Sequence, residues 1–123
     1  MTRLPEHKIA IDIRRKRIRL NKSIFTVLNY PEYIQLLVNP ETRSIVVMAS
    51  TKTKDSTKVQ GNLTKGFEMT SLGLIRSLQK LCPDWTDDNN YHIPGAYVES
   101  ADVVEFDMKD AVPYSRTGVS TNG

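Results

Sequence analysis

The sequence predicts a small α+β domain that is mainly β, built from two β-α-β-β halves packed into one barrel-like core. Alternating apolar and polar runs, typical of half-buried strands, recur along the chain of 123 residues. Two short stretches have helical apolar spacing and are followed by a proline. These elements occur in the same order in residues 7–48 and 66–108. We expect the halves to share a core that neither fills alone.

Two predicted strands open the first half. The run HKIAIDIR from residue 7 has isoleucine at every second position, so its apolar side chains share one face. After the run RRK the alternation resumes, with Arg17 and Arg19 on one side and Ile18 and Leu20 on the other. The basic side chains are therefore expected to face solvent while the apolar ones stay in the core.

A short helix and a hairpin complete the first half. Asn21 or Ser23 can cap a helix of barely two turns that ends near Leu28. The runs YIQLLV and SIVVM surround an Asn-Pro turn, which predicts a β-hairpin over 33–48. The polar, Thr/Lys-rich stretch 49–65 is expected to join the halves as an exposed ribbon or a loop.

The second half repeats this order of elements. Thr70 or Ser71 can cap a helix that Pro83 ends, and two further β-rich runs follow it. Residues 1–113 are therefore expected to form a single domain of two similar halves. The polar residues 114–123 are expected to be a disordered tail.

Charge is divided unevenly along the chain. Residues 1–66 carry thirteen Lys/Arg and five Asp/Glu, a balance of +8, whereas residues 67–123 carry four and nine, a balance of −5. Six of the nine residues in RRKRIRLNK are basic, and these are Arg14, Arg15, Lys16, Arg17, Arg19 and Lys22. Such a surface attracts nucleic acid by releasing the counterions condensed on its phosphates. The other interpretation is a solvated charged ribbon.

Few residues offer catalytic or metal-binding chemistry. His7 and His92 have no partner at metal-ligand spacing, and the sequence contains no nucleophile elbow and no glycine-rich phosphate loop. The single cysteine, Cys82, is expected to be a small buried side chain at the end of a helix. The sequence therefore predicts a protein without enzymatic activity, metal or cofactor.

Other features bear on partners and location. In the acidic second half, the candidates for binding a protein partner are Trp85, Asp87 and Asp88, and the alternative interpretation of Trp85 is a half-buried lid on the core. Neither an apolar run of membrane-spanning length nor a signal peptide is present, so a cytoplasmic protein without membrane contact is expected.

The stretch KRIRLNKSIFTVLNYPEYIQLLVNPETRSIVVM resembles the swapped-hairpin DNA-binding proteins of the AbrB/MazE/SpoVT class. Their core reads as a strand, the motif G-R-hydrophobic-x-hydrophobic-P, a short helix ending in L-G-I, and a β-hairpin. The matching arginine, apolar pair and helix-ending leucine are Arg17, Ile18, Leu20 and Leu28. In two departures, Lys16 stands for the glycine and Asn21 for the proline. The resemblance implies a DNA-binding regulator or antitoxin, normally an intertwined homodimer that presents arginines to DNA.

We therefore expect a DNA-binding transcriptional regulator that uses a basic β-ribbon. Duplex DNA is the expected partner because no aromatic residues that could stack on unpaired bases are interleaved with the basic ones. The alternative is a phage or mobile-element inhibitor or adaptor, for example of the anti-CRISPR type, that binds a host protein or nucleoprotein complex. A homodimer is favoured over a monomer. In a monomer, the second half would take the place of the second chain.

Overall fold

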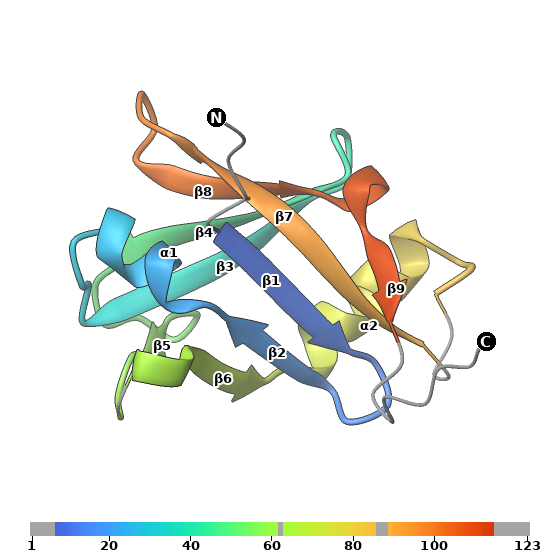
Figure 1. Cartoon of the computed structure of the whole chain (residues 1–123), viewed down its shortest axis with the longest axis horizontal. Coiled ribbons are helices and arrows are strands. Elements are labelled where there is room, and N and C mark those ends of the chain that lie inside the picture. Colours follow the sequence, from blue (N-terminus) through green and yellow to red (C-terminus); the bar gives the residue numbers. More distant parts are fainter. Residues whose placement is uncertain (1–6, 62, 86–88, 115–123) are drawn as a thin grey trace.

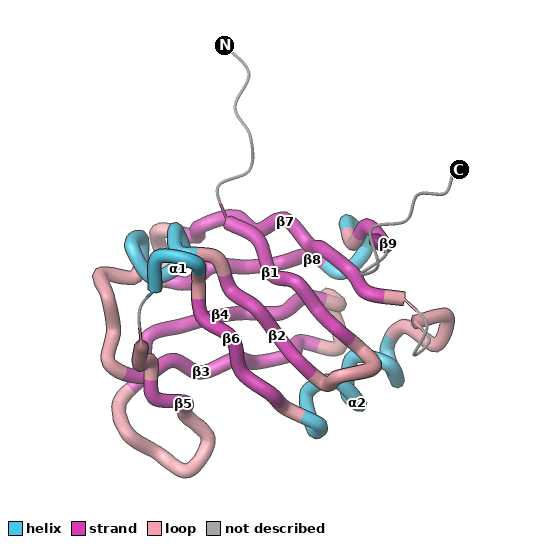
Figure 2. The backbone as a smooth tube through the Cα atoms, turned by 60° about the horizontal axis from the view of Figure 1, so that its bottom comes forward, coloured by secondary structure: helices cyan, strands magenta, loops and turns pink. Residues whose placement is uncertain are grey.

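One antiparallel sheet of nine strands curls into a half-barrel in the computed structural model of the chain (Figures 1 and 2). The structure describes residues 7–61, 63–85 and 89–114. The strands are β1 (His7–Asp12), β2 (Arg17–Leu20), β3 (Tyr33–Asn39), β4 (Ser44–Ser50), β5 (Thr57–Lys58), β6 (Phe67–Thr70), β7 (Asn90–Val98), β8 (Val103–Asp107) and β9 (Val112–Tyr114). The helices are α1 (Lys22–Val27), α2 (Leu72–Leu81) and the 3-10 turns η1 (Leu63–Lys65) and η2 (Met108–Asp110). The prediction of a mainly β fold is confirmed.

The strand order joins the two halves within this sheet. The order is β5-β3-β4-β8-β7-β1-β2-β6, and β9 pairs with β7. Three antiparallel pairs cross between the halves: β1 with β7, β4 with β8, and β2 with β6. A further pair joins β3 to the short strand β5, which lies between the halves in the sequence. The halves are therefore connected by backbone hydrogen bonds as well as by a common core.

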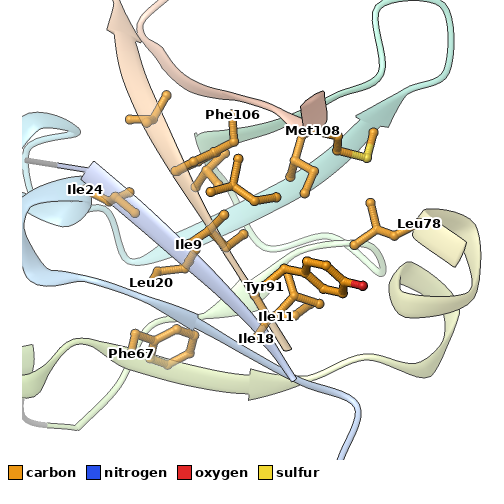
Figure 3. Packing of buried hydrophobic residues seen from close by; sticks show 14 of the residues in the cluster. Ile9, Ile11, Ile18, Leu20, Ile24, Phe67, Leu78, Tyr91, Phe106 and Met108 are labelled. Carbon is orange, nitrogen blue, oxygen red and sulfur yellow. The ribbon is translucent and has the colours of Figure 1, made fainter. Parts of the chain in front are cut away.

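The predicted alternation in the first two strands is confirmed. Ile9 and Ile11 of β1 and Ile18 and Leu20 of β2 are fully buried. Figure 3 shows these side chains in the same interior as Phe106 of β8. Since successive side chains of a strand point to opposite faces, the polar residues between them lie on the outer face of the sheet.

The two helices lie at opposite ends of the curled sheet (Figure 1). Helix α1 follows Asn21, whose side chain makes no capping hydrogen bond. Helix α2 has the predicted cap, because the Ser71 hydroxyl oxygen accepts a hydrogen bond from the Leu74 N–H at 3.2 Å. Phe25 of α1 packs edge-on against Phe67 of β6, with ring centroids 5.8 Å apart, and so links the first half to the second. No helix in the described ranges is long and apolar enough to cross a membrane.

The chain departs from its predicted organisation at the C-terminal end. Tyr114, which the sequence places in a tail, is the last residue of β9 and pairs with Asn90. A three-residue strand carries too little alternation to be recognised in a sequence. The rest of the predicted tail, residues 115–123, lies outside the described residues. The linking stretch 49–65 is largely loop, with β5 and η1 within it.

Two leucines of α2 provide a matched test of the shared core. Leu78 is fully buried and Leu72 is 47 % exposed. We expect Leu78→Ala to lower the free energy of unfolding by about 2–5 kcal/mol through reduced burial and a residual cavity. Leu72→Ala, the same change on the same helix, is expected to cost less than about 1 kcal/mol. Urea unfolding followed by circular dichroism measures both, and equal losses would contradict the packing described.

Candidate nucleic-acid interface

The outer face of β6, β2, β1, β7 and β9 gathers the residues of the candidate site. The pairing registers place one residue from each of these strands in a row, namely Thr70, Arg17, Asp12, Asn90 and Tyr114. The adjacent row on the same face contains Glu68, Arg19, Ala10, His92 and Val112. Residues far apart in the sequence therefore share one surface.

Most of the predicted basic residues are exposed along this surface. Arg14 and Arg15 are exposed in the turn between β1 and β2. On β2, the side chains of Arg17 and Arg19 are 47 % and 59 % exposed. Lys22 is exposed at the first residue of α1. The basic series therefore runs from the turn, along β2, to the start of the helix.

Lys16 differs from the other predicted basic residues because its side chain folds back on the turn. Its Nζ donates to the carbonyl oxygen of Ile13 at 3.0 Å and to that of Arg14 at 3.4 Å. Its backbone is in the left-handed region, with φ of 57°. The buried Asp12 carboxylate supports the same turn by accepting from the Arg15 N–H at 3.2 Å. Lys16 thus stabilises the turn that presents its neighbours.

Glu68 holds the two arginines of β2 together. Its Oε2 lies 3.1 Å from Nη1 of Arg17, and its Oε1 accepts from Nη2 of Arg19 at 3.0 Å. Glu68 can reach both because it is directly opposite Arg19 in the β2–β6 pair and diagonal to Arg17. One carboxylate therefore orients two guanidinium groups and offsets part of their charge.

A hollow of about 350 Å³ opens on this face. It is lined by Lys8, Ala10, Asp12, Arg17, Arg19, Asn21, Glu68, His92 and Tyr114. The register explains it, because the methyl group of Ala10 lies between the longer side chains of Arg19 and His92. The hollow is thus formed by a short side chain at the centre of a row of long ones.

An aromatic pair borders the hollow opposite the arginines. The rings of His92 and Tyr114 are stacked, with centroids 3.8 Å apart and an interplanar angle of 24°. Burial, and secondarily the positive charge of Lys8, lowers the pKa of His92 from its ordinary value. At neutral pH this imidazole is therefore neutral and offers a flat ring.

Trp85, which follows α2, is not exposed as an aromatic anchor would be. Trp85 is only 6 % exposed and stacks on Tyr91 with ring centroids 4.2 Å apart. Its side chain covers the core, so the alternative interpretation of Trp85 as a lid fits the structure. Asp87 and Asp88, the other two predicted partner-binding residues, lie outside the described residues.

The remaining candidates for reactive chemistry do not assemble. Burial first, and the charge of Asp84 second, raise the pKa of the Cys82 thiol, which keeps it protonated. His7 Nδ1 lies 2.8 Å from the Ser23 hydroxyl oxygen, which ties β1 to α1. Within the described ranges no group of three or more His, Cys, Asp or Glu side chains could hold a metal ion.

Sequence reasoning missed several lining residues of the hollow. Lys8 could have been predicted from the sequence, because it alternates with the isoleucines of β1 and so lies on the outer face. The positions of His92 and Tyr114 depend on the pairing of β7 with β1 and β9, for which the sequence contains no local signal.

Comparison with protein-family models, with curated proteins and with solved structures finds no match.

The lowered pKa of His92 predicts a pH dependence of stability. The folded chain binds a proton on the His92 imidazole less tightly than the unfolded chain does. The contribution of His92 to the free energy of unfolding is therefore present above its ordinary pKa of about 6.5 and is lost as pH falls below that value. We expect the free energy of unfolding to fall less steeply in His92→Gln than in the wild type over this range. Urea unfolding at a series of pH values tests this, and identical slopes would contradict it.

Proposed function

We propose that this chain is a small nucleic-acid-binding protein, a DNA-binding transcriptional regulator, that contacts phosphates through its basic outer surface. One observation carries the proposal: five exposed basic side chains follow one another from the β1–β2 turn to the start of α1. We call this set the basic ribbon, and its members are Arg14, Arg15, Arg17, Arg19 and Lys22. A group of exposed cations on one surface is the footprint that a polyanion recognises.

The shape of the basic ribbon supports this proposal. Arg17 and Arg19 are two residues apart on a strand, which places them on one face about 7 Å from each other along it. Because β2 lies inside the sheet, between β1 and β6, these arginines would contact phosphates from a broad surface and not from a two-stranded ribbon inserted in the major groove. Arginine also suits phosphate, since its planar group can donate two parallel hydrogen bonds.

The contacts of Glu68 favour binding in one respect and oppose it in another. By holding Arg17 and Arg19 in place, Glu68 reduces the side-chain entropy that the arginines would lose on binding phosphate. Its negative charge weakens the attraction of the same surface for a polyanion. Glu68 therefore lowers the affinity of this surface for a polyanion and fixes the orientation of Arg17 and Arg19.

The pattern of strand pairing supports the proposed relation to swapped-hairpin DNA-binding proteins. The first strand of the first half, β1, pairs with β7, while the short strand β5 before the second half pairs with β3. Each hairpin is thus extended by a strand from outside its own half. In this proposal the second half takes, within one chain, the place of the partner in an intertwined dimer.

The alternative function, an inhibitor or adaptor that binds a protein or nucleoprotein complex, is favoured by a different surface. Glu105, Asp107 and Asp110 line a second hollow, of about 430 Å³, together with Thr42 and Ser44. This acidic surface suits a basic partner better than a nucleic acid. Failure of the chain to bind nucleic acid would leave this function as the better proposal.

Replacing both arginines of β2 tests the proposed function. We expect Arg17→Gln/Arg19→Gln to weaken binding of duplex DNA and to reduce the slope of log K against log salt by roughly two, about one for each phosphate that the variant no longer neutralises. Stability should change by less than about 1 kcal/mol because exposed ion pairs contribute little. Fluorescence anisotropy with a labelled duplex over a range of salt concentrations measures the slope.

The matched control removes the same charge from a different surface. Arg76 and Lys80 are exposed on α2, and Arg76→Gln/Lys80→Gln is expected to leave the salt slope nearly unchanged. An equal decrease in both double variants would mean that only net charge matters. Unchanged binding in the β2 variant would reject the basic ribbon as the contact surface.

Substitution of Glu68 is expected to act in the opposite direction. Glu68→Gln removes one negative charge between Arg17 and Arg19, so affinity for duplex DNA should rise and the salt slope should steepen. Glu99→Gln, which alters an exposed carboxylate in the loop after β7, is the control. Anisotropy titrations compare the two, and weaker binding by Glu68→Gln would show that orientation of the arginines outweighs the repulsion.

A further inference from the structure

We propose that the hollow on the outer face holds one unpaired nucleotide, with its base against the His92–Tyr114 pair and its phosphate towards the cations of β1 and β2. This inference rests on the proposed function and deepens it. The preferred ligand would then be nucleic acid with a single-stranded segment, such as a tail next to a duplex.

The dimensions of the hollow suit such a ligand. Its volume of about 350 Å³ falls in the range of roughly 300–1,000 Å³ that is usual for small-ligand sites. Ala10 keeps its centre open, with Arg19 on one side and His92 on the other. A nucleotide laid across this row would meet a cation at one end and a ring at the other.

The charges that line the hollow fix the direction of the nucleotide. Lys8, Arg17 and Arg19 supply three positive charges from β1 and β2. Glu68, between the two arginines, and the buried Asp12 supply two negative charges. The lining is therefore net positive, and the exposed guanidinium groups of Arg17 and Arg19 can donate hydrogen bonds to a phosphate. The phosphate therefore belongs at the arginine end and the base at the aromatic end.

The aromatic end offers the surface that unpaired bases use on β-sheets. Exposed aromatic side chains on a sheet stack with bases of single strands, and stacking tolerates any base. His92 and Tyr114 both line the hollow, and Val112, which follows His92 in its row, is 58 % exposed. Paired bases inside a duplex could not reach these rings, so the aromatic pair distinguishes unpaired from paired nucleic acid.

The experiment compares three labelled ligands by fluorescence anisotropy at one salt concentration: a blunt duplex, the same duplex with a short thymidine tail, and that duplex with an abasic tail of equal length. We expect the wild type to bind the thymidine-tailed duplex about five- to a hundredfold more tightly than the other two. Equal affinity for the thymidine and abasic tails would overturn the inference, because phosphates alone would then explain the binding.

Variants of Tyr114 locate the effect. Tyr114→Leu should abolish the preference for the thymidine tail, and Tyr114→Phe should retain it, since only the ring is required. Circular dichroism checks that both variants keep the fold of the wild type. A preference that survives in Tyr114→Leu would reject the site, whereas weaker blunt-duplex binding by Arg17→Gln/Arg19→Gln still reports separately on the proposed function.

Discussion

The hydrogen bonding of β1 on both of its edges is the constraint on which the fold and the site depend. β1 pairs with β2 from its own half and with β7 from the other half. Its isoleucines fill the core while Lys8, Ala10 and Asp12 belong to the outer face of the sheet, where they line the hollow. A slip of one residue in either pairing would exchange the two faces, burying charge and exposing the isoleucines. The burial of these isoleucines therefore also fixes the position of the hollow.

Local patterns predict the elements of this chain well because each depends on a few neighbouring residues. Alternation located β1 and β2, and Ser71 caps α2 as expected. The candidate site was predicted only in part. The basic ribbon could be read from consecutive residues, but the placement of Tyr114 in the same row as Arg17 depends on successive pairings between β2, β1, β7 and β9. Such long-range register leaves no periodic signal in the sequence.

The folded chain also redistributes the charge that the sequence divides between its halves. Because β6 pairs with β2, Glu68 from the acidic half is placed between two arginines of the basic half. The linear separation of charge is thus partly cancelled in space on this face. It persists elsewhere, where Glu105 and Asp107 of β8 line a separate acidic hollow. The surface has local regions of either sign, which suits recognition of a particular shape better than general attraction.

The two ends of the candidate site lie on strands that differ in how many neighbouring strands they pair with. Arg17 and Arg19 are on β2, which is paired on both edges, with β1 and with β6. Tyr114 is on β9, a strand of three residues that pairs only with β7 among the described strands. Local opening costs least where few hydrogen bonds and buried contacts must be broken, so β9 can detach without disturbing β2. Phosphate contact and base stacking are therefore physically separable. Conditions that loosen β9 should first remove the contribution of stacking on Tyr114 to the affinity for nucleic acid.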